Sequence, residues 1–175
     1  MKSLAAFLLA TFVGAVSGDS RFLQDSNCTE IMEVICDNDG EYELNTLCQA
    51  IQMAGIEDEF DMDTWTVFAP VDAAFNSIPS EAITALMGGP DMDDDRGLAD
   101  ILAFHAVGGV ALESTDLRCD GRTFMANEEF TVTICEGDRV FQTGIGNPVT
   151  DYPEIVVSDI ETCNGYVHLI SGVML

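Results

Sequence analysis

The sequence predicts a single α+β domain, and three observations carry this prediction. Apolar residues recur mostly at helical spacing up to residue 108, interrupted by one short apolar run of strand-forming residues. After residue 121, apolar and polar residues alternate, which is typical of strands. No strand–helix–strand unit repeats, so the pattern favours helices packed on a sheet. A chain of 175 residues has the length of one ordinary domain, which we expect to span residues 28–175.

The N-terminus predicts export. One basic residue and a short apolar run precede Ser17 and Gly18, small residues suited to signal-peptide cleavage. A membrane anchor is the alternative, but the run is shorter than the roughly 20 residues that a bilayer requires. We therefore expect residues 1–18 to be a signal peptide, 19–27 a short N-terminal segment, and the mature protein to be extracellular and outside the membrane. Asn27 begins the only N-x-S/T sequon and is the predicted glycosylation site.

The chain is strongly acidic. It carries 31 Asp and Glu against 6 Lys and Arg, a formal net charge of -25. This balance disfavours nucleic acid as a partner, because a phosphate backbone is bound by basic residues. It also disfavours a polybasic membrane anchor. With 47% hydrophobic residues, the chain is too apolar to be disordered.

The N-terminal half contains an amphipathic helix after a shorter one at residues 28–36. The apolar stripe of the longer helix falls at i, i+3, i+4 and i+7, on Leu44, Leu47, Cys48 and Ile51. Gly55 provides its C-terminal stop.

Two polar residues further along can cap short helices. Asp72 is expected to cap a helix that runs through Phe75, and Ser80 another that runs through Met87. An acidic loop follows at residues 88–95. The last predicted helix carries its apolar stripe on Leu98, Ile101, Leu102 and His105 and stops at Gly108 and Gly109.

Strand patterns begin with the apolar run 65–69, which Pro70 closes. Residues 130–135 alternate large apolar residues with threonine, which predicts a half-buried strand. A turn at Asn127 would place Phe124 opposite Phe130 in a hairpin. Further strands are expected at residues 139–143, 155–157 and 166–175.

The six cysteines predict disulfides, because exported chains fold in an oxidising compartment. The hairpin register places Cys119 opposite Cys135. A continuous helix would separate Cys28 from Cys36 by roughly 12 Å, too far for a bridge, so Cys36 is expected to pair with Cys48 across the intervening turn. The candidate third pair is Cys28–Cys163.

Four segments, in this order, resemble the fasciclin (FAS1) family. They are Thr66–Pro70 continued by Asp72 and Ala74-Phe75, then Ile101–Val107, then Val157–Ile160 followed by Asn164–Ile170, and finally Val173–Leu175. In the second segment, Phe104 precedes His105 where the family has tyrosine. The resemblance covers about residues 28–175.

The resemblance implies a β-wedge or sandwich with N-terminal and inserted helices packed against it. It further implies a secreted adhesion or matrix module that binds a cell-surface or extracellular-matrix protein or glycan noncovalently. In some members, two residue pairs are implicated in partner binding. These pairs map here to Phe104-His105 and Asp159-Ile160.

The same residues also have structural explanations. His105 lies on an apolar helix stripe, so burial with satisfied hydrogen bonds accounts for it. Asp159 can satisfy the backbone donors of a turn, and His168 could face the core or the solvent. No H-E-x-x-H or G-x-S-x-G motif is present, so we expect neither an enzyme nor a metal centre or cofactor.

The acidic segments leave a second hypothesis open. Residues 57–59 and 91–95 could hold calcium weakly, because carboxylate oxygens are its usual ligands. On that interpretation the protein is a secreted acidic binding protein for a small ligand or a divalent cation.

Overall fold

The computed structural model describes residues 28–37, 40–78 and 97–175. The predicted signal peptide, the segment 19–27 with Asn27, the predicted helix from Ser80 to Met87 and the acidic loop 88–95 lie outside the described residues. Within the described ranges, no helix has the length and apolar character needed to cross a bilayer.

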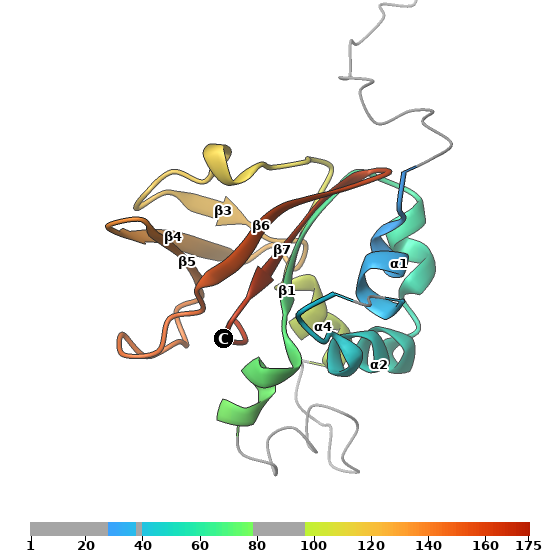
Figure 1. Cartoon of the computed structure of the whole chain (residues 1–175), viewed down its shortest axis with the longest axis horizontal. Helices are drawn as coiled ribbons and strands as arrows, with labels where there is room; N and C mark the ends of the chain where they lie inside the picture. Colours follow the sequence, from blue (N-terminus) through green and yellow to red (C-terminus); the bar gives the residue numbers. More distant parts are fainter. Residues whose placement is uncertain (1–27, 38–39, 79–96) are drawn as a thin grey trace, which may run out of the picture.

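Helices and strands among the described residues are distributed as in an α+β chain (Figure 1). The helical elements are α1 (Ile31–Cys36), α2 (Asn45–Ala54), α4 (Leu98–Ala103) and the 3-10 turns η2 (Glu57–Asp61), η3 (Asp72–Ser77) and η4 (Ser114–Asp116). The strands are β1 (Trp65–Pro70), β2 (Ala106–Gly108), β3 (Arg122–Phe124), β4 (Phe130–Glu136), β5 (Arg139–Thr143), β6 (Ile155–Thr162) and β7 (Gly165–Ile170).

The strands form two sheets. Sheet A has the order β2-β1-β7-β6, and sheet B has the order β3-β4-β5. β1 runs parallel to β7 and antiparallel to β2. Helices α1, α2 and α4 lie on one side of sheet A, and sheet B lies on the other (Figure 1). The predicted α+β class is therefore confirmed.

Strand β1 is buried on both faces, as its unbroken apolar run predicts. Val67 and Ala69 belong to the apolar cluster beneath the helices. Phe68, with no exposed surface, belongs to a second cluster between the two sheets. β1 thus joins the two halves of the core.

Helix α2 forms where its apolar stripe predicts, and Gly55 ends it in the left-handed conformation with φ 66°. The prediction that Asp72 caps the helix that it begins is wrong. Asp72 makes no cap hydrogen bond to its own helix η3. It accepts hydrogen bonds from the Thr46 backbone N–H at 2.8 Å and the Asn45 side chain at 3.0 Å. It therefore satisfies an amide of the first turn of α2, where helix donors lack intrahelical partners.

The last predicted helix is shorter than expected. α4 ends at Ala103, and Ala106–Gly108 forms β2 instead of continuing to the predicted stop. Val107 pairs with Thr66 of β1. Pairing with the sheet satisfies the backbone groups that a longer helix would have satisfied, so tertiary contacts override the local periodicity.

Three disulfides join the cysteines in the pairs Cys28–Cys163, Cys36–Cys48 and Cys119–Cys135. The β3–β4 hairpin has the predicted register, with Phe124 opposite Phe130. The Cys119–Cys135 bridge extends that hairpin on its opposite face. The Cys28–Cys163 bridge links the N-terminal segment before α1 to the turn between β6 and β7.

Strand β4 buries its polar side, the reverse of the usual arrangement. Thr131 and Thr133 are 0% and 1% exposed, whereas Phe130 and its partner Phe124 are 38% and 69% exposed. The buried threonines are satisfied by Gln142 of β5, which accepts from Thr133 at 2.7 Å and donates to Thr131 at 2.5 Å. Because this network satisfies the buried polar atoms, sheet B can turn its aromatic residues outward.

Candidate functional site

Phe104 and His105 lie at the end of α4, and both are buried, with 6% and 3% of their surface exposed. Phe104 packs in the cluster between the sheets. Their rings meet edge to face, with centroids 6.4 Å apart. A partner that approaches the folded protein therefore meets little of either side chain.

His105 has a hydrogen-bond partner at each ring nitrogen. Nδ1 donates to the Ile101 carbonyl at 2.8 Å, and Nε2 accepts from the Met174 backbone N–H at 2.9 Å. This pairing requires the neutral ring with its proton on Nδ1. Burial lowers the pKa of His105 to about 4, although the hydrogen bond to Ile101 acts in the opposite direction. His105 thus fastens α4 to the C-terminal segment, as the structural explanation predicts.

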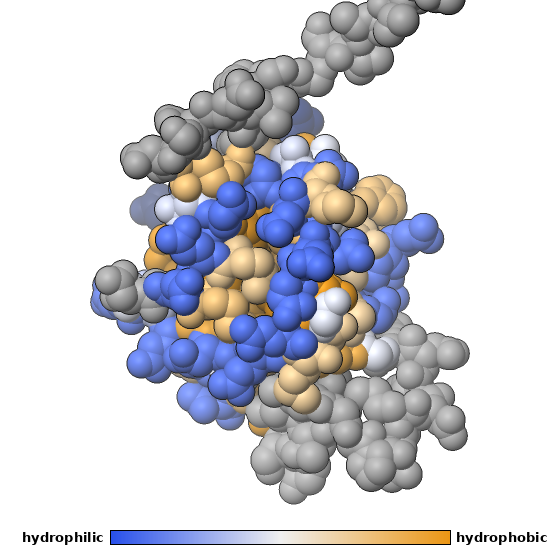
Figure 2. Space-filling view, turned by 90° about the vertical axis from the view of Figure 1, so that its right-hand side faces the viewer, coloured by the Kyte–Doolittle hydropathy of each residue, from blue (hydrophilic) through white to orange (hydrophobic). Residues whose placement is uncertain are grey.

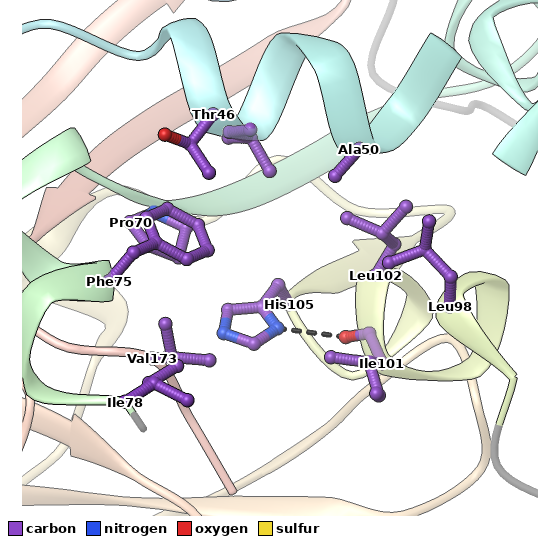
Figure 3. A pocket seen from close by; sticks show the side chains of 11 residues that line it. Thr46, Ala50, Pro70, Phe75, Ile78, Leu98, Ile101, Leu102, His105 and Val173 are labelled. Atoms are coloured by element: carbon purple, nitrogen blue, oxygen red, sulfur yellow. Dashed lines mark hydrogen bonds between the residues drawn. The ribbon is translucent and has the colours of Figure 1, made fainter. Parts of the chain in front are cut away.

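The ring of His105 also lines a small apolar pocket between α2, α4 and η3 (Figure 3). Its volume is about 40 Å³, far below the ≈300 Å³ or more of a typical ligand site. The ring lies between Phe75 and Val173 on one side and the side chains of α4 on the other (Figure 3). The geometry fits a packing gap and gives no support to a small-ligand site there.

Asp159 lies within β6, at an irregularity of the strand. The pairing register shifts between Val157 and Ile160, so that Ser158 and Asp159 together oppose His168, which is the arrangement of a β-bulge. Asp159 has φ 63°, a left-handed conformation that few non-glycine residues adopt. Its side chain remains 37% exposed.

The carboxylate of Asp159 is held by one residue from a distant segment. Oδ1 accepts from the Ser114 backbone N–H at 2.6 Å, and Oδ2 from the Ser114 hydroxyl at 2.5 Å. Partial burial alone would raise the pKa of Asp159, but the hydrogen bonds from Ser114, together with one from Ser158 and the interaction with His168, lower the pKa overall. Asp159 thus does satisfy a turn, but the turn is η4 and not the one that follows β6.

His168 supports this arrangement from β7 and is completely buried. Nε2 donates to the Leu112 carbonyl at 2.9 Å, and Nδ1 accepts from the Asp159 backbone N–H at 3.1 Å. Burial lowers the pKa of His168, while the Leu112 hydrogen bond and the Asp159 charge act against that shift. The neutral ring therefore connects the bulge to residues 110–116. The sequence singled out His168 only as an unassigned histidine, and nothing local marked Ser114.

The structure does not bring the two predicted pairs together. Phe104 and His105 immediately precede β2 at one edge of sheet A, whereas Asp159 and Ile160 belong to β6 at the other edge. β1 and β7 lie between them, so the edges are roughly 14 Å apart at three strand spacings. A single patch containing all four side chains does not exist on the described surface.

The described residues provide no evident centre for metal chemistry. Within residues 28–37, 40–78 and 97–175, no three or more His, Cys, Asp or Glu side chains gather as a metal site would require. His105 and His168 each use both ring nitrogens in structural hydrogen bonds.

Residues 42–175 match the Fasciclin domain family. The chain belongs to that family. Among solved structures, a FAS1 domain pair from the insect cell adhesion molecule Fasciclin I matches with a TM-score of 0.51 at 20% identity, covering 74% of this chain and 45% of that one. At this identity, the match supports the fold.

Two curated relatives show how widely the domain occurs. The immunogenic protein MPB70 of Mycobacterium bovis is 28% identical over 139 residues, which cover 76% of this chain and 63% of MPB70. The transforming growth factor-beta-induced protein ig-h3 of Sus scrofa is 30% identical over 156 residues, which cover 87% of this chain and 21% of ig-h3. This fasciclin-domain chain therefore spans only part of either relative.

Proposed function

We propose that this fasciclin-domain protein is a secreted adhesion or matrix module that binds a cell-surface or extracellular-matrix protein or glycan noncovalently. The observation that carries the proposal is the family match over residues 42–175. The fold neighbour comes from a protein described as an insect cell adhesion molecule. Function is carried by sites and not by folds, so the proposal also needs a contact surface.

The contact surface that we propose is the bulge of β6 with Asp159 and Ile160. Asp159 offers a carboxylate that is partly exposed and fixed in place by Ser114. Ile160 is half-buried at the same edge of sheet A. Phe104 and His105 act on binding indirectly, because their buried contacts hold the opposite edge of the sheet in place.

Secretion is part of the proposal. The three disulfides use every cysteine in the chain, which suits an oxidising compartment. The predicted signal peptide at residues 1–18 would deliver the chain there. A binding role outside the cell follows from that location.

The proposal is tested by the attachment of cells from the source organism to surfaces coated with the disulfide-bonded protein. A coat of the same chain, reduced and denatured, is the control, because it carries the same charge as the native protein but lacks its fold. Attachment that requires the native fold supports adhesion, and attachment no higher than the control overturns it. The second hypothesis is tested on the isolated protein, because a divalent cation that binds the folded chain raises its melting temperature when calcium is added.

Variants at the bulge locate the contact. Asp159→Gly removes the carboxylate, and glycine adopts φ 63° without strain. We expect attachment to weaken by about tenfold, equivalent to about 1.4 kcal/mol. Stability should also fall, by about 0.5–1.5 kcal/mol for each hydrogen bond to Ser114 that is lost, and relief of the positive φ offsets part of that loss. Glu161→Ala is the matched control, since it removes an exposed acidic charge from the same strand. Equal loss in both variants would show that net charge, and not the bulge, governs attachment.

A further inference from the structure

An open groove of about 530 Å³ lies between α1, the segment after it, and the β6–β7 hairpin. Val34 lines it from α1, while Val157, Ile160 and Leu169 line it from the sheet. Its volume is that of a site that holds several side chains. The groove thus offers apolar surface directly beside the proposed contact residue Ile160.

The rim of this groove is acidic. Glu33, Asp37 and Glu41 are exposed and line it. The described residues between 28 and 108 contain no lysine or arginine, so none of them offers the rim a basic partner. On the side of the molecule that carries α1 and α2, hydrophilic residues surround a patch of apolar ones (Figure 2). A complementary partner would present apolar side chains together with a positive charge.

Sheet B presents such a surface at the tip of the β3–β4 hairpin. The rings of Phe124 and Phe130 are exposed, with centroids 6.5 Å apart. The guanidinium of Arg122 lies 4.3 Å from the centroid of the Phe130 ring. Because Arg122, Phe124 and Phe130 share the outward face of the hairpin, the charge and the aromatic surface are displayed together.

Arg122 is the arginine best placed to pair with another molecule. The arginines of the described residues are Arg118, Arg122 and Arg139, all in or beside sheet B. Arg139 is already paired with Glu154, its Nε donating at 2.8 Å. Within the described part of the chain, Arg122 has no carboxylate at ion-pair distance, and it stacks on an aromatic ring that is itself exposed.

We propose that a second copy of this chain occupies the groove, with the β3–β4 hairpin of one copy docked against α1 and β6 of the next. Phe124 and Phe130 would cover the apolar floor, and Arg122 would meet the carboxylates of the rim. The two surfaces differ and lie on opposite sides of sheet A, so the association is head-to-tail and extends beyond a dimer. If the protein is the adhesion module proposed above, an extended assembly would add avidity to its binding.

The net charge of -25 opposes the approach of two copies at long range. The assembly is therefore weak at low ionic strength, where repulsion is least screened, and stronger near physiological salt. Sedimentation velocity of the disulfide-bonded protein, over a concentration series at both salt levels, measures this. A monomer at every concentration overturns the inference, and a monomer that still supports cell attachment leaves the proposed function intact.

Substitutions test the interface itself. Phe124→Ser should weaken self-association by about tenfold or more. Ile145→Ser is the matched control, because Ile145 is 97% exposed and lies outside both surfaces. Equal behaviour of these two variants would contradict docking through the hairpin.

A charge exchange separates the specific ion pair from the net charge. Arg122→Glu and Glu33→Arg should each remain monomeric at concentrations where the wild type associates. An equimolar mixture should associate again, because the acidic hairpin of one variant meets the basic rim of the other, and the remaining interface is that of the wild type. A mixture that stays monomeric overturns the inference, since mixing alters the pairing without altering the mean charge.

Discussion

The two edges of sheet A carry the two residue pairs for which the fasciclin resemblance implies binding, yet they differ in what they expose. At the β2 edge, His105 is 3% exposed and both ring nitrogens are bonded inside the fold. At the β6 edge, the Asp159 side chain is 37% exposed. The same resemblance thus covers one pair that holds the fold together and one pair that a partner can reach.

The comparison also shows why a motif does not by itself identify a contact residue. Phe104 lies so close to Gly144 that a Cβ there would come within 2.7 Å of the Phe104 ring. Asp159, in contrast, is exposed, and its close polar partners include Ser114, Ser158 and His168. Changes at the first edge should therefore act on folding, and changes at the second on binding.

The largest effect is expected from Phe104→Ala. The ring is buried among Phe68, Ile170 and Met174, so its removal should lower the free energy of unfolding by about 3–5 kcal/mol through lost burial and a residual cavity. Chemical denaturation measures the loss. Phe124→Ala is the matched control, because that ring is 69% exposed and should change stability by less than about 0.5 kcal/mol. A small change in the free energy of unfolding for Phe104→Ala would contradict the assignment of this edge to the core.

The second effect is a dependence of folding stability on pH that arises from His105. The pKa of this histidine is about 4 in the folded chain, against 6.5 for an exposed histidine. The unfolded chain binds more protons between these values, so stability falls as pH is lowered from 6.5 towards 4. The full contribution is on the order of 3 kcal/mol.

His105→Ala isolates this contribution from those of other groups. At pH 7 it should cost about 1–3 kcal/mol, because Ile101 and Met174 lose a buried partner. The cost should shrink as the pH approaches 4, where the wild type has lost the advantage of a neutral ring. Denaturation midpoints at pH 7, 5.5 and 4 measure this, and a cost independent of pH would contradict the role assigned to burial.

The smallest effect is expected from Ser114→Ala at the β6 edge. The variant removes the hydroxyl hydrogen bond to Asp159 and keeps the backbone one. At this exposed site the loss of stability should be about 0.5–1.5 kcal/mol. Melting temperature and cell attachment, measured on the same samples, compare the loss of stability with the loss of binding. If a fixed carboxylate is the contact, the free energy of attachment should fall by more than the free energy of unfolding does. Equal losses in the two free energies would indicate a structural role alone.

The sequence determined by itself those features that depend on neighbouring residues. The stripe of α2 and its stop at Gly55 require only a repeat of 3.6 residues and a residue free to adopt φ 66°. The register of the β3–β4 hairpin follows from one turn, and with it the Cys119–Cys135 pair. The buried strand β1 could be predicted because a short apolar run is recognised in the sequence without knowledge of its partner strands.

Only the tertiary structure decided the features that depend on distant partners. α4 ends early because Val107 pairs with Thr66, and β4 turns its threonines inward because Gln142 satisfies them. Asp159 binds Ser114, which is 45 residues away in the chain. Local periodicity records which faces are apolar, but which face is covered, and by what, depends on packing between segments that the chain brings together only when it folds.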